Sequence, residues 1–225
     1  MSELFASQKA ASRPRLSSRF TREGMLVIIS GPSGSGKGTV VKGLCANDAF
    51  ALSVSVTTRK PRPDEKHGRD YFFTSEEDFI KMRENGELLE HALYVNNFYG
   101  TPRNYALEQI RNGKIVVLEI DVQGALQVRD KFREAVLVFL MPPSMDELAA
   151  RLRARGSEDD VTIEARLKKA YEEIPLINKY DYLVVNDDVM QATCDINAIV
   201  AAEQMKPARS ASLIQAFASE ARIKQ

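Results

Sequence analysis

The stretch GPSGSGKGTV at residues 31–40 decides how this sequence folds. It matches the pattern G-x-x-x-x-G-K and directly follows the apolar run MLVIIS at residues 25–30, which is short enough to be a buried strand. Glycines in such a loop let successive backbone N–H groups turn inward around a phosphate. The helix that begins near Lys37 points its positive end at the same anion. The pattern therefore predicts a phosphate-binding loop between a strand and a helix.

Three further apolar runs without helical periodicity, at residues 115–120, 135–141 and 182–185, predict buried parallel strands. Helical stretches separate these runs. Alternation of strand and helix implies an α/β fold in which helices cover both faces of a parallel sheet. The predicted helices span residues 38–45, 105–112, 124–132, 145–155, 162–179 and 191–205.

Residues 51–102 interrupt the alternation of strand and helix, and they predict a mainly β subdomain that projects from the sheet. A charged, glycine-containing segment, RARGSEDDVT, lies between two predicted helices and is typical of a mobile lid. Within the inserted subdomain we expect short strands at 52–57, 70–74, 88–95 and 98–101 around one helix near 76–84. The expected organisation is a core of residues 25–50, 103–142 and 160–205, a subdomain at 51–102 and a lid at 143–159.

The two ends of the chain have a different composition from the rest. The first 24 residues are rich in Ser and Arg, and we expect them to form a flexible extension. A transit peptide has a similar composition, but Glu3 and Glu23 argue against it. The tail at residues 206–225 is expected to fray.

The overall composition excludes several classes of protein. Lys plus Arg and Asp plus Glu both total 31, so no global field favours nucleic acid or a membrane surface as a partner. Cys45 and Cys194 are too few for a disulfide framework, and they fit a reducing compartment such as the cytoplasm. No apolar run approaches the roughly 20 residues of a membrane helix. The composition leaves a homo-oligomer open.

One position in the loop departs from the common pattern. Gly38 stands where such loops usually carry Ser or Thr, so Thr39 supplies the nearest hydroxyl. The run GKGT resembles the nucleoside monophosphate kinases, in which most ligands of the metal ion are phosphate oxygens and water. Because Mg²⁺ keeps several waters and bridges nucleotide phosphates, such a weakly liganded site is chemically acceptable. Thr39 and Asp121, which follows the predicted strand IVVLEI, are the candidates for holding Mg²⁺ through water.

The insertion carries SVSVTTRKPRPDEKHGRDYFF at residues 53–73, and here the chain resembles the guanylate kinases, over residues 25–205. The most specific elements are TTRKPR, GRDYFF, LLEHALYVNNFYGTP and VVNDD. The resemblance implies Mg²⁺-dependent transfer of the γ-phosphate of ATP to GMP. It implies an ATP site at Gly31, Pro32, Ser33, Gly34, Ser35, Gly36, Lys37, Gly38 and Thr39, with adenine near Asn186 and Asp187.

The resemblance also implies the acceptor site. Two arginine forks and two phenol groups suit a dianionic phosphate. Guanine presents an N1–H and an amino group side by side, and a carboxylate accepts from both, which suits Glu90. By position, GMP would be bound by Arg59, Arg62, Tyr71 and Tyr99 at its phosphate and by Ser55, Glu90, Thr101 and Asp121 at its base.

Positive charge around the transferring phosphate is the remaining requirement of this chemistry. Arg151 and Arg155 lie at helical i, i+4 spacing and hence on one face, and Arg166 follows on the next predicted helix. A solvated arginine-rich helix is the alternative interpretation. The resemblance implies that Lys37, Arg151, Arg155 and Arg166 are the catalytic residues.

Two other functions stay open at this point. One is a guanylate-kinase-like module that binds a phosphorylated peptide without catalysis, which an intact GSGKGT argues against. The other is a kinase of another phosphorylated ribose compound. Glu90 together with Thr101 disfavours it, because such a substrate offers no guanine edge to bind.

Overall fold

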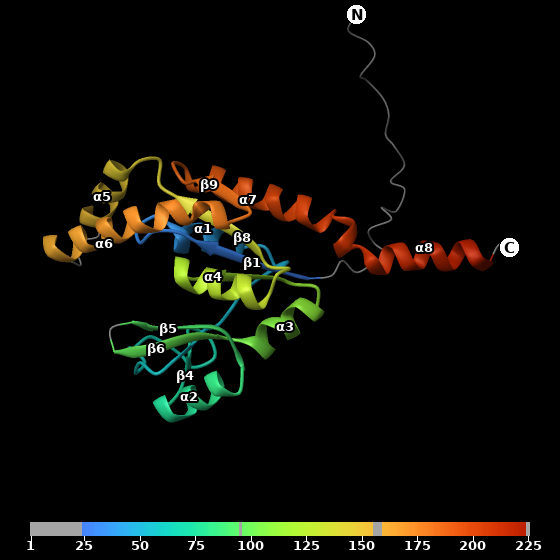
Figure 1. The fold of residues 1–225 in the computed structure, drawn as a ribbon, viewed down its shortest axis with the longest axis horizontal. Helices are drawn as coiled ribbons and strands as arrows, with labels where there is room; N and C mark the ends of the chain where they lie inside the picture. The colour runs from blue at the N-terminus through green and yellow to red at the C-terminus, as the bar shows by residue number, and fades with distance from the viewer. Residues whose placement is uncertain (1–23, 95, 155–158, 224–225) are drawn as a thin grey trace, which may run out of the picture.

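The computed structural model describes residues 24–94, 96–154 and 159–223, and its strands form a larger core sheet and a second, smaller sheet (Figure 1). The core sheet has five strands in the order β2-β7-β1-β8-β9, and every pair is parallel, as predicted. Its strands are β1 (Met25–Ser30), β2 (Phe50–Leu52), β7 (Ile115–Glu119), β8 (Val136–Met141) and β9 (Tyr182–Val185).

Helices cover both faces of the core sheet. Val27 and Ile29 of β1 are buried with the apolar side chains of α1 (Lys37–Leu44) and α7 (Val189–Gln204). Leu26 and Ile28 point to the other face. There they pack with side chains of α3 (Arg103–Arg111) and α4 (Val122–Lys131). Because successive residues of a strand alternate between faces, burial on both sides explains why this run contains no polar residue before Ser30.

The second sheet lies to one side of the core sheet and has the order β4-β3-β6-β5, with parallel and antiparallel pairs (Figure 1). Its small core contains Phe79, which is fully buried and stacks on Phe98 with 5.3 Å between ring centroids. Leu89 is buried with side chains of α3 and α4, so the two sheets share packing. The elements are β3 (Val56–Thr57), β4 (Phe72–Phe73), α2 (Glu76–Glu84), β5 (Leu88–Tyr94) and β6 (Asn97–Pro102).

The structure divides one predicted strand between the two sheets. Residues 52–57 were expected to form a single strand of the insertion. Instead, Leu52 ends β2 in the core sheet and Val56 begins β3 in the second sheet. The N–H of Ser53 still bonds the Val117 carbonyl, and the chain then crosses to the other sheet. Alternating serines and apolar residues suit either sheet, so the pattern alone does not locate the crossing.

The lid side of the molecule is helical. It consists of α5 (Met145–Ala154) and α6 (Asp160–Glu173), followed by a 3-10 helix, η2 (Ile174–Lys179). The single helix predicted over 162–179 is therefore wrong at its end. Pro175 lacks an N–H and disrupts the α-helical pattern there. Residues 155–158, which include Arg155 and part of the predicted lid, lie outside the described residues, as does the N-terminal extension apart from Gly24.

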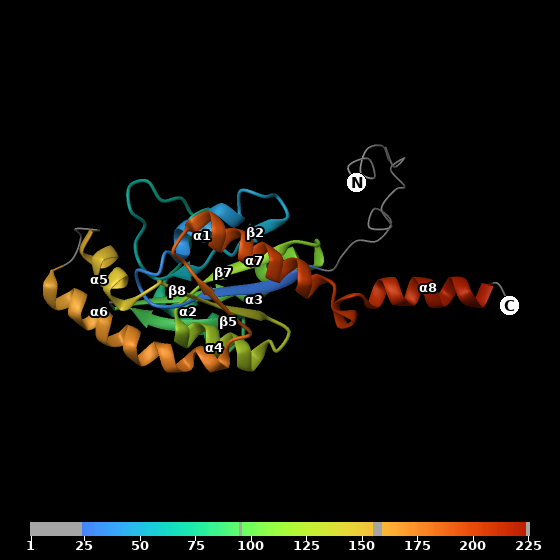
Figure 2. The ribbon, with the colours of Figure 1, turned by 90° about the horizontal axis from the view of Figure 1, so that it is seen from above.

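The prediction that the C-terminal tail frays is wrong for most of its length, because α8 (Ala211–Ile223) forms after the 3-10 turn η3 (Pro207–Arg209). Alanine and Leu213 favour a helix. The buried carboxylate of Glu203 fixes the start of this segment through Lys206 at 2.6 Å and Arg209 at 3.5 Å. Both views show α8 projecting away from the sheets (Figures 1 and 2). Among the described residues, no helix is long and apolar enough to cross a membrane.

Deleting residues 211–225 should leave the melting temperature within about 2 °C of that of the full chain. A shift of this size corresponds to a change of about 1 kcal/mol in the free energy of unfolding. The physical reason is that the buried clusters of the described chain contain no side chain of α8. Differential scanning calorimetry of both forms checks this. A fall of more than about 5 °C would mean that α8 packs on the body.

Candidate functional site

A cavity of about 540 Å³ lies where the phosphate loop, the second sheet and helix α6 meet. It brings together nine of the residues that the sequence singled out. Gly31, Ser33 and Lys37 come from the loop, and Asp121 and Arg166 from the elements after β7 and on α6. From the inserted region come Ser55, Tyr71, Glu90 and Tyr99.

The phosphate loop connects β1 to α1 and depends on close packing against residue 186. Gly36 has a φ of +90°, and a Cβ there would lie 2.3 Å from Nδ2 of Asn186. That Nδ2 donates a 2.8 Å hydrogen bond to the carbonyl of Ser35. Asn186 is only 1% exposed, and breaking this buried hydrogen bond would be costly. The bond therefore holds the backbone of the loop at Ser35. Asn186, expected near adenine, thus holds the loop with its amide, while Asp187 is exposed beside it.

Lys37 folds back over its own loop. Its Nζ donates to the carbonyls of Gly31 at 2.7 Å and Pro32 at 3.0 Å, and it lines the cavity. Gly38 and Thr39 are exposed at the start of α1. The carboxylate of Glu119, at the end of β7, lies 3.4 Å from the position that a Cβ on Gly38 would occupy. A Cβ at position 38 would therefore make an ordinary van der Waals contact with Glu119.

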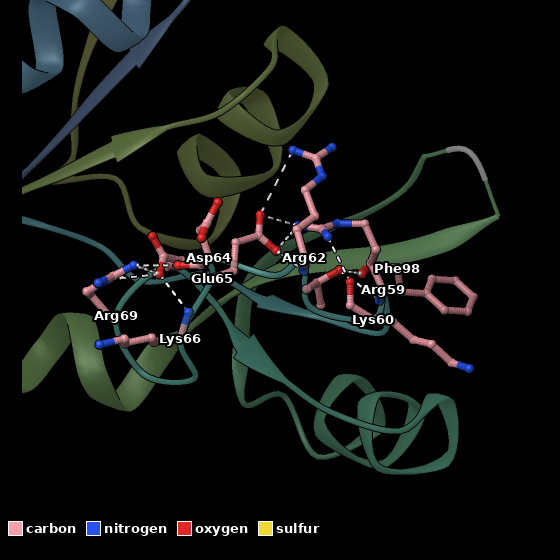
Figure 3. A network of polar contacts seen from close by, with 10 residues as sticks. Arg59, Lys60, Arg62, Asp64, Glu65, Lys66, Arg69 and Phe98 are labelled. Atoms are coloured by element: carbon pink, nitrogen blue, oxygen red, sulfur yellow. Dashed lines mark hydrogen bonds and ion pairs between the residues drawn. The ribbon is translucent and has the colours of Figure 1, made fainter.

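Arg59 is held in place by the carboxylate of Glu65 (Figure 3). Its Nη2 donates to both oxygens of Glu65, at 2.8 and 2.9 Å, and its guanidinium lies 5.4 Å from the ring centroid of Tyr71. Arg59 keeps the pKa of the Glu65 carboxyl below its usual range. The side chain of Arg62 is 74% exposed and only approaches Glu65 at 4.0 Å. Arg59 and Arg62 are not among the residues that line the cavity, although Arg59 lies against the ring of Tyr71, which does line it.

Glu90 is a buried carboxylate of the site. It is 5% exposed, and Oγ1 of the fully buried Thr101 donates to its Oε1 at 2.8 Å. Burial raises the pKa of Glu90 to about 7, the negative charge of Asp121 adds to this, and the hydrogen bond from Thr101 opposes it. Gly124 lets the two carboxylates approach the start of α4, since a Cβ there would lie 3.1 Å from Oε2 of Glu90.

Asp121 begins helix α4. Its Oδ1 accepts a 2.8 Å hydrogen bond from the N–H of Gly124, which satisfies one of the unpaired donors at the helix start. Its Oδ2 lies 3.6 Å from Nζ of Lys169 on α6. Asp121 therefore has a structural role in addition to the binding role that the sequence indicated.

Arg166 and Arg151, two of the predicted catalytic arginines, lie in different environments. Nη1 of Arg166 donates to Oγ of Ser33 at 2.5 Å, so Arg166 reaches from α6 to the phosphate loop. Arg151 donates through Nε to Glu147 at 2.8 Å and through Nη2 to the carbonyl of Asn186 at 3.0 Å. It thus contacts the segment beneath the loop and does not line the cavity. Arg155 lies outside the described residues.

Three charged residues of the cavity were not predicted as site residues: Glu119, Lys169 and Glu173. Lys169 and Glu173 lie three and seven positions after Arg166, so they share its face of α6. Helical periodicity extended beyond Arg166 would have found both. The described residues contain no group of three or more His, Cys, Asp or Glu side chains that could hold a metal ion.

Comparison with known proteins points to one family. The sequence profile described as guanylate kinase matches residues 23–203. The chain is 47% identical over 193 residues to a guanylate kinase of Caldanaerobacter subterraneus subsp. tengcongensis, which covers 85% of this chain and 94% of that protein. It is 49% identical over 190 residues to one of Bacillus subtilis, covering 84% and 93%. A crystal structure of guanylate kinase from Anaplasma phagocytophilum superposes with a TM-score of 0.67 at 38% identity, covering 84% of this chain and 90% of that one.

The raised pKa of Glu90 predicts a pH-dependent stability. An acid whose pKa is raised by folding keeps its proton where the unfolded chain has lost it, so its contribution to stability falls as pH rises from about 4.5 to about 7. A Glu90→Gln variant does not lose stability in this way as pH rises, because glutamine does not titrate. Its free energy of unfolding relative to the parent should therefore rise across this window by up to about 3 kcal/mol.

Urea unfolding at a series of pH values measures this difference. Glu87→Gln, which removes an exposed carboxylate just before β5, is the matched control. A difference between Glu90→Gln and the parent that does not change from pH 4.5 to 8 would contradict the environment described for Glu90.

Proposed function

Since this chain belongs to the guanylate kinase family, we propose that it transfers the γ-phosphate of ATP to GMP and releases ADP and GDP. Guanylate kinase activity follows from close relatives that match most of the chain, and the substrates at each subsite are our proposal. The observation that carries it is the single cavity lined by both Lys37 and Glu90. One cavity that holds a phosphate loop and a base-reading carboxylate suits direct transfer between two nucleotides.

The acceptor side suits a guanine base. Ionised Glu90 would accept from the N1–H and the amino group of guanine, and the hydroxyl of Ser55 would donate to its exocyclic oxygen. Thr101, whose one hydroxyl proton goes to Glu90, would act on the base through that carboxylate. Thr101 already donates to Glu90 and so holds the carboxylate in one orientation. Adenine would leave this buried carboxylate without its two donors, which is costly.

The acceptor phosphate would be bound next to the base by groups from the inserted region, three in loops beside the second sheet and Tyr99 on β6. Arg59 and Arg62 supply guanidinium donors, and Tyr71 and Tyr99 supply phenol donors. The two tyrosine rings pack edge to face with 6.0 Å between centroids, so both phenols come from one wall of the cavity. An ionised phosphate oxygen is itself the nucleophile, and no general base is needed.

The donor phosphates would be held by the loop from Gly31 to Thr39, with Lys37 following the transferred group. Lys37, Arg151, Arg155 and Arg166 would place positive charge around the equatorial oxygens, which is where charge lies in the transition state. Arg166 supports this assignment through its contact with Ser33, because α6 then carries a cation to the loop. Adenine would lie near Asn186 and Asp187.

Mg²⁺ with ATP fits the residues at this point of the fold. The exposed hydroxyl of Thr39 and the carboxylates of Glu119 and Asp121 are oxygen groups of the kind that magnesium reaches directly or through water. Magnesium held there would neutralise part of the charge of the ATP phosphates. We retain Thr39 and Asp121 as water-mediated ligands and add Glu119, whose carboxylate lies against Gly38.

The parts of the chain divide the work in this proposal. The core of residues 25–50, 103–142 and 160–205 holds the donor. Residues 51–102 bind GMP, and the lid at 143–159 closes over the transferring phosphate. Closure would exclude water and strengthen the interactions between charges inside the cavity. The inserted subdomain and the lid are expected to move toward the core sheet when both nucleotides are present.

Selectivity for the base is the first prediction of this proposal. With MgATP, turnover of GMP should exceed that of AMP, CMP and UMP by about 10⁴ in kcat/KM, because a mismatched base leaves buried polar groups unpaired. Glu90→Gln should lose most of this preference through a weaker reaction with GMP. A coupled assay run on the four nucleotides in parallel measures it. Equal turnover of AMP and GMP would show that the roles of Glu90, Ser55 and Thr101 are wrong.

The role of Lys37 is the second prediction. Lys37→Ala should lower kcat by about 10² to 10³, because electrostatic stabilisation of the transferring phosphate is lost in a closed site. Lys42→Ala is the matched control, since Lys42 lies exposed near the end of the same helix. Steady-state kinetics with a melting curve for each variant compares the two. Near-normal turnover of a folded Lys37→Ala protein would refute the loop assignment.

A further inference from the structure

Lys169 connects helix α6 to the opposite wall of the cavity. Its Nζ lies 3.6 Å from Oδ2 of Asp121, which follows β7, and 3.6 Å from Oε1 of Glu173 on its own helix. The pair with Glu173 joins two residues of one helix and cannot hold that helix against anything else. The pair with Asp121 crosses between α6 and the core sheet. Of the two ion pairs of Lys169, only the one with Asp121 can therefore restrain the position of α6.

Arg166 lies one turn before Lys169 on the same face of α6. Arg166 donates to Ser33 of the phosphate loop, while Lys169 reaches Asp121 on the acceptor side. Helix α6 thus contacts both halves of the cavity through two cations. Two such contacts, one turn apart, restrict the rotation and sliding of the helix. The orientation of Arg166 then depends on the contact made by Lys169.

Lys169 is one of two lysines that act on the carboxylates of this wall. Burial raises the pKa of Glu173, Lys169 and Lys37 lower it, and the negative charge of Asp121 raises it. Asp121 raises the pKa of Glu90 in the same way. The repulsion between Asp121 and Glu173 acts between the core sheet and α6, so it would push the helix away from the cavity. Lys169 lies between the two carboxylates and offsets that repulsion.

We propose that Lys169 is a positioning residue, whose ion pair with Asp121 holds helix α6 in the place where Arg166 reaches the phosphate loop. It is about half exposed, at 51%, so each pair contributes modestly. The proposal rests on the phosphoryl transfer proposed above, because the arginine that Lys169 positions would act in the transition state. Lys169 itself touches neither reacting group.

Three variants test this role by steady-state kinetics with GMP and MgATP. Lys169→Met should lower kcat about fivefold with KM for GMP within about twofold, because a displaced Arg166 weakens the transition state more than substrate binding. Lys169→Arg should restore most of kcat. Lys168→Met, which removes the adjacent exposed charge, should match the parent. A Lys169→Met variant whose KM rises while kcat holds would make Lys169 a substrate-binding residue and overturn the proposal.

A double-mutant cycle separates the partner of Lys169. Asp121→Asn keeps a residue that can start α4, since asparagine is also a good helix N-cap. If Lys169 acts through Asp121, adding Lys169→Met to Asp121→Asn should change kcat by less than about twofold. A second full fivefold loss in the double variant would show that Lys169 does not act through Asp121.

Hydrogen exchange keeps this inference independent of the proposed function. In the protein without nucleotides, Lys169→Met should increase the exchange of backbone amides in α6, while Lys168→Met should not. Unchanged exchange in α6 would overturn the positioning role. If the parent failed to phosphorylate GMP, the proposed function would fall, but the exchange experiment would still decide whether Lys169 holds the helix.

Discussion

Parallel pairing of β1 with β7 is the constraint on which the rest of the site depends. Ile29 of β1 stands opposite Glu119 of β7, so both strands end at the same edge of the sheet. The chain continues from β1 into the phosphate loop and from β7 to Asp121. Groups that lie about 90 residues apart in the sequence therefore meet at one edge. Ligands of open α/β sheets gather at this edge because loops and helix starts converge there.

The inserted sheet depends on a second, smaller core. Phe79, Val56 and Leu88 are buried together, and they fix β5 relative to β3. Glu90 follows on the same strand, where the pairing of β5 with β6 is irregular between Leu88 and His91, and the hydrogen bond from Thr101 holds its carboxylate. Leu89 points the other way and is buried with side chains of α3 and α4. A single strand thus attaches the acceptor wall to the domain that would hold the donor.

Local patterns predicted much of the molecule because each one depends on nearby residues. The glycine pattern around Lys37 predicted the strand, loop and helix there, and four short apolar runs predicted four parallel strands of the core sheet. The run at 182–185 was expected to be buried, but Leu183 and Val185 are 49% and 43% exposed, because β9 is an edge strand of the sheet. Residues 52–57 were harder, because alternating serine is compatible with either sheet. The sequence did not predict the role of Glu65, because its two bonds to Arg59 depend on a loop fold that no periodicity describes. Lys169 was missed because its partner Asp121 lies on another element, far away in the sequence.

The ion pair between Arg59 and Glu65 also bears on the entropy of ligand binding. An arginine carries many rotamers, and ordering one when a ligand arrives costs about 0.5–1.5 kcal/mol. In this chain Glu65 orders the guanidinium during folding, so that loss is incurred before any anion arrives. The same carboxylate balances the charge of Arg59 while the ligand is absent. An anion that bound Arg59 as proposed would meet a guanidinium that is already ordered and already paired with Glu65.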